Sequence, residues 1–537
     1  MKSRILSVLA MIVLAVTCLT LAGCKDDDKS NAQNAANTIR ILSGSENKEL
    51  EPMVQAFAQR EGIKIEVTYM GSVDIMLEIE KGTQSTFDAV WPADRTWITM
   101  SDNARVIKDV QSIYRTPVVF GVKQSVAKRL GWVGKPVSVN DILTAAKAGK
   151  FRYMMTSASQ SNSGASIYLA YLNAFAGSPE VLSMADLQNP AVANNVRTLL
   201  ATVNRTVGSS GFLKDTYVQQ SDLYDGMVNY ETMIVAANQD LVRQGKEPLY
   251  VVYPTDALSI ADSPLGFVNH GDANKEQLFL KLQAYLLDAP QQAAMLTSGH
   301  RTGGLGITVP NADPAVFNPA LGFDTKTNLP VVNKPTPEVI REALILYQTA
   351  FRKPSLTIYI DDFSGSMGGN PLDQLKSGMR TVLDQDIARG YFLQASPRDV
   401  TITMLFDDKI IGIKKVEGNN PDDLRGMSEW VTSVPVGGGT DFYTPLTKAL
   451  SMIKAYDYEK YNVAIVLMTD GRSDGNVNAF NAEAQRLGLT GVPIYSIMFG
   501  DADSSQLTAL AKGSSGKVFD GRKNLIGAFR EVKGYNN

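Results

Sequence analysis

The chain has few histidine and cysteine side chains, which bind metals or act in catalysis through nitrogen or sulfur. Only two histidines and two cysteines occur among its 537 residues. His270 and His300 are too few for a histidine-based metal site or a catalytic histidine pair. Both cysteines, Cys18 and Cys24, lie close to the first residue. Any metal centre in the rest of the chain is therefore expected to use oxygen ligands.

Both cysteines belong to a segment typical of export. Lys2 and Arg4 precede the apolar run "ILSVLAMIVLAVTCLTLAG", and polarity begins at Cys24 with "CKDDDKSNAQ". A short apolar run after a positive start predicts a secretory signal, and it is short for a permanent membrane span. Cys18 leaves with the signal, so the mature chain has no disulfide to form, and an oxidising compartment is permitted.

The residues "LAGC", which end at Cys24, resemble the lipobox of bacterial lipoproteins. The resemblance implies that Cys24 becomes the first mature residue and carries a lipid. The alternative is a chance cysteine in an ordinary signal peptide. Lys25 after the cysteine resembles lipoproteins that reach the outer membrane. We therefore expect a lipid-anchored protein of the cell envelope, on the periplasmic or cell-surface side, with the outer membrane favoured if two membranes are present.

Excess basic charge is also lacking. Without Lys2 and Arg4, 50 basic residues face 55 acidic ones, so no nucleic-acid partner is expected. The polar residues up to about Asn37 predict a disordered tether. The length exceeds one ordinary core. We expect the segments 1–23 (signal), 24–37 (tether), 38–335 (first domain), 336–354 (connecting helix) and 355–537 (last domain).

From Thr38 the pattern alternates between strands and helices, which predicts an α/β fold. "TIRILSGS" is a strand that ends in a hydroxyl and glycine turn, the helix "ELEPMVQAFAQREG" follows, and "IKIEVTYMGS" is a second strand with a similar end. In such folds ligands bind beyond the strand ends, where helix N-termini present free amides.

The stretch from "ILSGSENKEL" to "FDAVWPAD" resembles the first lobe of type II periplasmic solute-binding proteins, most nearly those for small oxyanions. "TPVVFGVKQSVAKRLG" resembles the crossover into a second lobe. The resemblance implies a bilobed domain over residues 38–335 that binds a small anion or polar solute. It adds Ser43, Ser45 and Ser72 as solute ligands, which by themselves are ordinary turn residues.

The loop before the helix "SIYLAYLNAFAG" is rich in uncharged donors, and the same family resemblance identifies it as the ligand loop of the second lobe. Serines and an asparagine at a helix N-terminus suit a small anion or a polar solute. They are equally the preferred capping residues of a solvent-facing loop, and that alternative stays open. The candidate solute ligands here are Ser161, Asn162, Ser163 and Gly164.

"TPEVIREALILYQTAFRKPS" predicts a helix that ends before Pro354. It is either the last helix of the first domain or a rigid strut between the domains. His300 and Arg301, in "SGHRTGG", are expected on a surface loop rather than at an anion site.

Three separated strand ends in residues 355–537 carry oxygen ligands. "SLTIYI" leads into "DDFSGSMGG", "VPVGGGTDF" precedes a helix, and "YNVAIVLMTDG" is a buried strand that ends in an acid. "VTITMLF" and "KIIGIK" predict a hairpin between them. Oxygen ligands with few charges favour a hard cation such as Mg²⁺, with Mn²⁺ or Ca²⁺ possible. The candidate metal ligands are Asp362, Ser364, Ser366, Thr440 and Asp470.

These three motifs, in this order, resemble the metal-ion-dependent adhesion site (MIDAS) of von Willebrand factor A (VWA) domains. The resemblance implies a Rossmann-like domain with a mostly parallel central sheet. It implies direct metal ligation by Ser364 and Ser366, direct or water-mediated ligation by Thr440, and water-mediated ligation by Asp362 and Asp470. It also implies an open metal position that an acidic side chain of a protein partner fills. Asp361 is then structural, because it is displaced from the motif by one residue.

The sequence therefore predicts an extracytoplasmic binding protein and no enzyme. The first domain binds a small solute, and the last grips an acidic group of a protein partner through a divalent cation. The alternative is the solute-capture component of a transport system, with the VWA-like domain as docking module. An enzyme lacks support, because neither a nucleophile with its base nor a carboxylate dyad is evident. The solute, the partner and the metal are not specified by the sequence.

Overall fold

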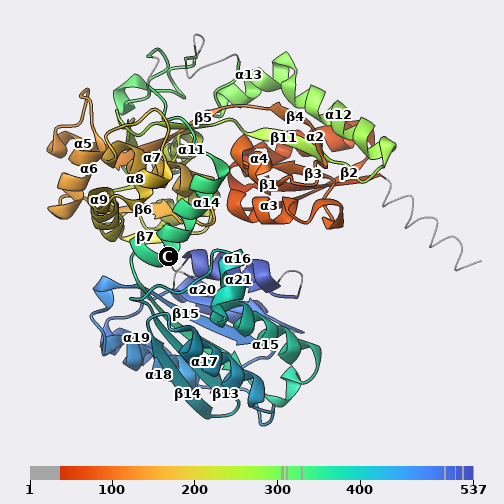
Figure 1. Cartoon of the computed structure of the whole chain (residues 1–537), viewed down its shortest axis with the longest axis vertical. Helices are drawn as coiled ribbons and strands as arrows, with labels where there is room; N and C mark the ends of the chain where they lie inside the picture. The colour runs from red at the N-terminus through yellow and green to blue at the C-terminus, as the bar shows by residue number, and fades with distance from the viewer. Residues whose placement is uncertain are drawn as a thin grey trace, which may run out of the picture.

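The computed structural model describes residues 37–537 except 304–307, 310–311, 328–329, 501–503, 515, 523–524 and 536–537. The predicted signal peptide and Cys24 lie outside the described residues, as does all of the tether but its last residue. Three sheets organise the rest of the chain: two belong to the lobes of the first domain and one to the C-terminal domain. Figure 1 shows the two lobes beside each other, with the C-terminal domain below them.

Lobe 1 is built on a five-stranded sheet in the order β2-β1-β3-β11-β4. β1 pairs in parallel with β2 and β3, whereas β11 returns antiparallel from lobe 2. The chain therefore enters lobe 1 twice. Its elements are β1 (Thr38–Gly44), η1 (Ser45–Leu50), α2 (Glu51–Glu61), β2 (Lys64–Met70), α3 (Ser72–Ile79), η2 (Gly82–Gln84), β3 (Ala89–Trp91), α4 (Arg95–Ser101), β4 (Ile107–Ser112), β11 (Pro264–Val268), α12 (Ala273–Leu287) and α13 (Ala289–Thr297).

Lobe 2 has a mixed six-stranded sheet in the order β10-β5-β8-β6-β7, with β9 paired to β5. Its elements are β5 (Thr116–Lys123), α5 (Gln124–Leu130), α6 (Val139–Lys147), β6 (Tyr153–Thr156), α7 (Asn162–Phe175), α8 (Met184–Gln188), α9 (Pro190–Ala201), β7 (Arg205–Val207), α10 (Ser210–Gln219), β8 (Gly226–Tyr230), α11 (Glu231–Arg243), β9 (Leu249–Val252), β10 (Ser259–Ala261) and η3 (Pro319–Leu321).

The C-terminal domain has a six-stranded sheet in the order β14-β13-β12-β15-β16-β17, in which only the edge strand β14 is antiparallel. The predicted hairpin and the mostly parallel sheet are confirmed. Its elements are β12 (Ser355–Asp362), η5 (Gly365–Met367), α15 (Asn370–Leu383), α16 (Gln385–Gly390), β13 (Val400–Phe406), β14 (Ile410–Glu417), α17 (Pro421–Ser433), α18 (Tyr443–Lys454), η6 (Tyr458–Lys460), β15 (Asn462–Thr469), α19 (Val477–Leu487), β16 (Ile494–Met498), α20 (Ser504–Ser514), β17 (Val518–Asp520) and α21 (Leu525–Tyr535).

The central strand β12 explains why this sheet needs helices on both faces. All eight of its residues are buried, and the side chains alternate between two apolar cores. Ile358 and Ile360 face the core of α18, α19 and α20. Tyr359 and Phe363 face α15, α17 and α21. β12 therefore ends between two helical layers, and the loop that follows it emerges at the carboxyl edge of the sheet.

The predicted connecting helix is α14 (Pro337–Leu346), and it continues as one π-helical turn, η4 (Tyr347–Phe351). It packs on lobe 2: the Tyr168 hydroxyl donates to the Ala343 carbonyl at 2.7 Å, and the Tyr168 ring lies edge-on to Tyr347. Val339 and Leu344 belong to the same core. This segment is thus held rigidly against lobe 2 until the chain enters β12.

The expectation that His300 and Arg301 lie on a surface loop is wrong. His300 is fully buried and Arg301 is 3 % exposed. Nε and Nη2 of Arg301 each donate to the Glu231 carboxylate at 2.7 Å, and Tyr253 joins the same network. The sequence could not predict this pair, because its members lie 70 residues apart and on different elements.

We expect Arg301→Met to destabilise the first domain by about 3–5 kcal/mol, because it leaves the Glu231 carboxylate buried without its cation. Differential scanning calorimetry of the full chain measures the shift. Arg243→Met is the matched control, since that guanidinium is largely exposed and contacts only Asp240 in the described ion pairs. Equal effects of the two substitutions would contradict the assignment.

Candidate functional site

Three loops meet at the carboxyl edge of the C-terminal sheet. The Gly365 N–H donates to the Gly438 carbonyl at 3.2 Å, and Gly437 N–H to the Phe363 carbonyl at 2.8 Å. These bonds join the loop after β12 to the glycine loop before α18. The Asp474 N–H donates to the Thr440 carbonyl at 3.2 Å, which joins the glycine loop to the loop after β15.

The predicted metal ligands lie together at this junction. The Ser366 hydroxyl donates to Oδ1 of Asp470 at 2.9 Å, and the hydroxyls of Ser364 and Ser366 are 3.2 Å apart. Oδ1 of Asp362 accepts the Ser364 N–H at 2.8 Å. The side chain of Thr440 faces Gly471, the residue after Asp470: its Oγ1 would lie 3.3 Å from a Cβ there.

The two adjacent acids of the first loop have different environments. Both are fully buried. Asp362 is hydrogen-bonded within the site, whereas neither carboxyl oxygen of Asp361 has a hydrogen-bond partner among the described residues. Burial raises the pKa of Asp362 to about 6, and the charge of Asp470 adds to the effect. Burial next to Asp362 raises the pKa of Asp361 well above its usual range. Asp361 therefore lies outside the ligand cluster.

Sequence reasoning missed Thr469. Its hydroxyl donates to Oδ2 of Asp362 at 2.5 Å and accepts the Gly471 N–H at 3.0 Å. This residue therefore orients Asp362 from the neighbouring strand. The signal was a hydroxyl directly before the acid in "LMTDG". Asp441, the residue after Thr440, is bonded to the start of α18, where it accepts from the N–H of Tyr443 at 3.0 Å.

The ligand set suits a small hard cation. It presents two carboxylates and several hydroxyls, with no nitrogen or sulfur ligand from the named residues. Ser366 and Asp470 are accessible, whereas Asp362 and Ser364 are buried behind them. In the part of the chain that the structure describes, no group of three or more His, Cys, Asp or Glu side chains is placed to hold a metal. A cation here therefore depends on the serine and threonine hydroxyls.

The seven predicted solute ligands occupy three different environments. Ser43 accepts from Nδ2 of Asn47 at 3.0 Å, and Ser72 accepts from the Ala93 N–H at 3.0 Å, both within lobe 1. Ser161 and Ser163 lie beside the Ser210 hydroxyl in lobe 2, at 3.2 and 2.8 Å. These four hydroxyls are committed to internal bonds.

Of these seven residues, Ser45 and Asn162 have described hydrogen bonds that bridge the lobes. Oγ of Ser45 accepts the Gly211 N–H at 3.0 Å, and Oδ1 of Asn162 accepts from Nε1 of Trp97 at 2.8 Å. Gly164 has a packing role, because a Cβ there would collide with the Thr156 carbonyl. The two lobes are therefore in contact through the predicted ligand loops.

Three buried residues near these loops, Glu46, Asn47 and Tyr114, were not identified by the sequence analysis. Asn47 is 2 % exposed and accepts the Tyr114 hydroxyl at 2.6 Å. Glu46 is 3 % exposed, and its Oε1 has no hydrogen-bond partner in the described part of the chain. Burial raises the pKa of Glu46 to about 7. No pattern in the sequence indicates this burial, since "SENKEL" is typical of a polar turn.

The buried carboxyl predicts a pH dependence. The pKa of Glu46 is 4.5 unfolded and about 7 folded, so its neutral form favours folding fully below pH 4.5. That stability is lost as the pH rises through 7, by about 3 kcal/mol in all. We expect Glu46→Gln to remove this part of the pH profile. Thermal unfolding of wild type and variant at pH 5 and pH 8 measures it, and parallel profiles would contradict the prediction.

Two family models match the chain. Residues 39–301 match the bacterial extracellular solute-binding proteins, and residues 358–524 match the von Willebrand factor type A domain. The chain joins a solute-binding domain to a VWA domain. No protein in the curated set matched the sequence. The α/β fold, the bilobed first domain and the Rossmann-like second domain are thereby confirmed.

The solved structures that resemble the chain include periplasmic binding proteins. The sulfate-binding protein SubI from Mycobacterium tuberculosis is 18 % identical, with a TM-score of 0.37, and the match covers 56 % of this chain and 93 % of SubI. Iron-bound HitA from Pseudomonas aeruginosa is 14 % identical, with a TM-score of 0.40, over 58 % of this chain and 98 % of HitA.

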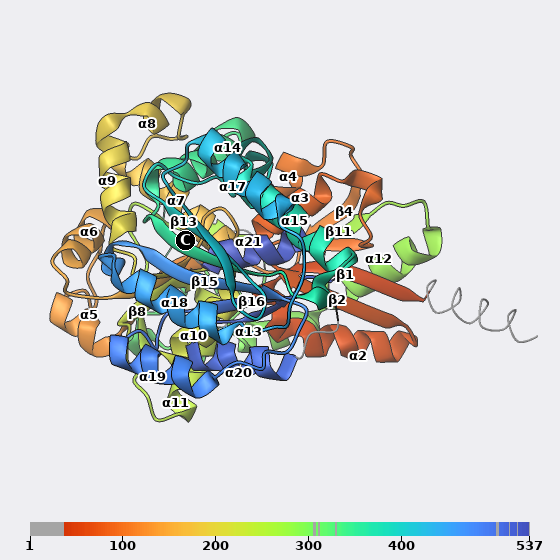
Figure 2. The same ribbon diagram turned by 90° about the horizontal axis from the view of Figure 1, so that it is seen from below.

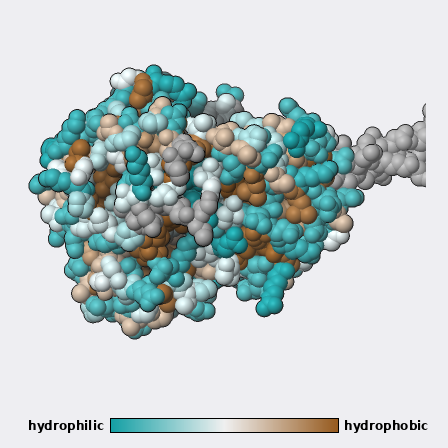
Figure 3. All heavy atoms as spheres, turned by 90° about the horizontal axis from the view of Figure 1, so that it is seen from above, coloured by the Kyte–Doolittle hydropathy of each residue, from teal (hydrophilic) through white to brown (hydrophobic). Residues whose placement is uncertain are grey.

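The solute-binding domain belongs to an extracellular family, which indicates an extracytoplasmic protein. Across the described residues, none of the helices combines the length and hydrophobicity that a membrane crossing requires. Figure 3 shows the face of the solute-binding domain opposite the VWA domain, where hydrophilic residues predominate and hydrophobic ones form small patches. This face is therefore mostly polar, as is usual for a surface in contact with water.

Proposed function

We propose that this protein is an envelope binding protein with two binding sites. The VWA domain holds a divalent cation and grips an acidic group of a protein partner, and the solute-binding domain takes a small polar solute. The observation that supports the first site most directly is the convergence of Ser364, Ser366 and Asp470 at one edge of the sheet. Neither site requires catalysis, so no enzymatic activity is proposed.

In this proposal Ser364, Ser366 and Thr440 ligate the cation, and Asp362 and Asp470 balance its charge, directly or through water. Mg²⁺ is the proposed ion because it binds oxygen ligands. Mn²⁺ and Ca²⁺ also bind oxygen ligands and are the alternatives. The accessible side of Ser366 leaves room for a carboxylate from the partner. We also propose that Cys24 carries the lipid that holds the protein in the envelope.

An immobilised peptide library tests the adhesive half of the proposal. We expect capture of peptides that carry Asp or Glu in the presence of Mg²⁺, and loss of capture with EDTA. Replacing the acid by its amide in a captured peptide should remove binding. Capture that is equal with and without the chelator would exclude a metal-dependent contact.

The two domains share a junction that supports linkage between the two sites. α21 of the VWA domain lies between the lobes and the VWA sheet (Figures 1 and 2). Arg530, on α21, is 3 % exposed; it pairs with Asp74 of lobe 1 and donates to the Ser159 carbonyl of lobe 2 at 3.3 Å. Nε2 of Gln160 donates to the Arg530 carbonyl. Because one side chain contacts both lobes, lobe closure and the position of α21 depend on each other.

A second candidate is solute capture for a transport system, with the VWA domain as docking module. The match of residues 39–301 to an extracellular solute-binding family favours it. Genes for a permease and its ATPase beside this gene, and solute uptake that fails on deletion, would support transport. Unchanged uptake in the deletion strain would count against it.

A further inference from the structure

The segment before α14 is fixed to lobe 2 where it reaches the boundary between the lobes. The Val332 N–H donates to the Leu258 carbonyl at 2.9 Å. Nδ2 of Asn333 donates to the Glu180 carbonyl at 3.1 Å. Both acceptors belong to lobe 2, because Leu258 directly precedes β10 and Glu180 follows α7. The residues that come next are therefore held at a defined position beside lobe 2.

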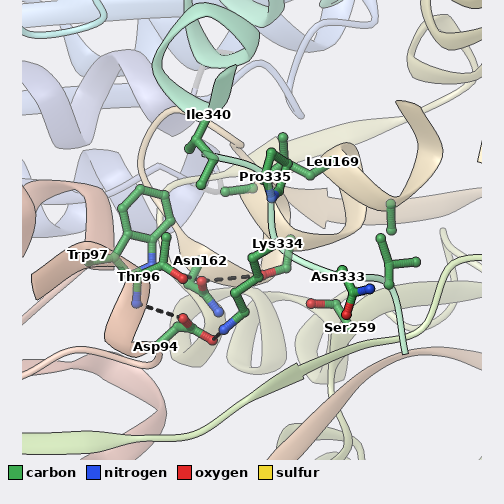
Figure 4. Close-up of a pocket in the computed structure, with 14 residues that line it drawn as sticks. Asp94, Thr96, Trp97, Asn162, Leu169, Ser259, Asn333, Lys334, Pro335 and Ile340 are labelled. Atoms are coloured by element: carbon green, nitrogen blue, oxygen red, sulfur yellow. Dashed lines mark hydrogen bonds and ion pairs between the residues drawn. The ribbon is translucent and has the colours of Figure 1, made fainter. Parts of the chain in front are cut away.

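Lys334, the next residue, extends to lobe 1. Figure 4 shows its side chain pointing toward the carboxylate of Asp94, with which it forms an ion pair. Asp94 directly precedes α4, its side chain is 2 % exposed, and it has no other ion pair among the described residues. A buried carboxylate that keeps its charge needs such a cation. Lobe 1 therefore depends here on a group from the connecting segment.

A second ion pair crosses the same boundary from α14. Nη2 of Arg341 donates to Oε1 of Glu80, which follows α3 of lobe 1, at 2.8 Å. This pair is part-exposed and adds little by itself. α14 is at the same time bound to lobe 2, because the Tyr168 hydroxyl donates to its Ala343 carbonyl. Residues 332–341 therefore contact both lobes at two successive places.

Two prolines make this segment stiff. Lys334 and Thr336 each precede a proline, and a residue before proline is restricted to extended backbone. The angles of Thr336, φ −65° and ψ 157°, agree with this restriction. A stiff segment loses little conformational entropy when Lys334 binds Asp94. The sequence "NKPTPE" is therefore suited to hold an ammonium group across the boundary.

Little space remains beside this segment. The pocket lined by Trp97 of lobe 1, Asn162 of lobe 2 and Pro335 has a volume of about 30 Å³, which is room for no more than a few water molecules. Trp97 and Asn162 are also the pair whose hydrogen bond bridges the lobes. The chain itself therefore fills this part of the boundary, and no solute is needed to fill it.

We propose that residues 332–341 are a latch that holds the two lobes closed in the absence of a solute. Lys334 supplies the cation that the closed boundary requires at Asp94, and Arg341 adds a second contact. The latch continues through α14 and η4 into β12, so it lies on the covalent connection between the two domains. Entry of a solute at this part of the boundary then requires release of the latch. The inference concerns lobe closure and does not depend on the proposed solute binding.

Hydrogen exchange of the full mature chain, with no solute added, tests the latch. Two backbone amides bond across the boundary, and neither lines the pocket beside the latch. The Val73 N–H of lobe 1 donates to the Gln160 carbonyl of lobe 2 at 3.0 Å. The Gly211 N–H of lobe 2 donates to Oγ of Ser45 of lobe 1 at 3.0 Å. We expect Lys334→Met to accelerate exchange at both amides at least about fivefold, because the lobes open more often.

Asp94→Asn is the second variant. It removes the charge but keeps an oxygen that accepts the Thr96 N–H, so α4 retains its cap. We expect it to accelerate exchange at the same two amides. The double change with Lys334→Met should accelerate exchange by less than the product of the two single factors, because both changes break one ion pair.

Lys326→Met is the matched control, because Lys326 is exposed in the same connecting segment and has no ion pair among the described residues. The amides of β12 are the internal reference for global unfolding, and their exchange should not change. Unchanged exchange at Val73 and Gly211 in both variants overturns the inference, as does an equal acceleration in Lys326→Met or in β12. Because no solute is present, these outcomes are independent of whether the domain binds one.

Discussion

Asp470→Ala should strongly weaken divalent-metal binding while the fold persists. The side chain is accessible at the end of β15 and contributes one of the two carboxylates of the site. Its loss leaves hydroxyls and one buried acid, and we expect the affinity for Mn²⁺ to fall by at least about tenfold. The electron paramagnetic resonance signal of free Mn²⁺, titrated with protein, measures the loss directly.

Asp474→Ala is the matched control for this experiment. Asp474 lies on the same loop and is exposed, and its described hydrogen bond comes from the backbone N–H, which the substitution keeps. We expect wild-type affinity from it. Wild-type Mn²⁺ affinity in Asp470→Ala, or a loss of equal size in Asp474→Ala, would rule out the proposed ligand set.

Arg530→Met should destabilise the protein about as strongly as Arg301→Met. The guanidinium is nearly fully buried, and it bridges Asp74 of lobe 1, the Ser159 carbonyl of lobe 2 and the Tyr391 carbonyl of the VWA domain. Its removal leaves the largely buried Asp74 carboxylate and two carbonyls at the domain junction without this donor. We expect a loss of about 3–5 kcal/mol.

Scanning calorimetry of the full chain measures this loss, and small-angle scattering measures whether the lobes and the VWA domain separate. Arg522→Met is the control, because Arg522 is part-exposed and its ion pair with Asp520 stays inside the VWA domain. Asp74→Asn combined with Arg530→Met should cost less than the sum of the single changes. Additive costs would show that the pair does not couple the domains.

The sequence alone predicted much of the fold for a physical reason. Strands with an apolar run and a polar end, such as "SLTIYI" before Asp361, are defined by local periodicity, and the chain order of such strands implies the sheet edge where their ends meet. This is why Asp362, Ser364, Ser366, Thr440 and Asp470 could be grouped from three separate motifs. Thr469 was missed although it directly precedes Asp470, because a hydroxyl at the end of a strand does not by itself indicate a site residue.

The tertiary structure decided everything that depends on which face of one element meets another. The serines around Asn162 were expected in a loop, but α7 begins at Asn162, so Ser163 lies in its first turn. Only packing showed that Ser161 and Ser163 are committed to Ser210 in the same lobe. The burial of Glu46 and the ion pairs of Lys334 and Arg530 likewise cannot be predicted from the sequence. Each depends on contacts across many residues, which no local periodicity encodes.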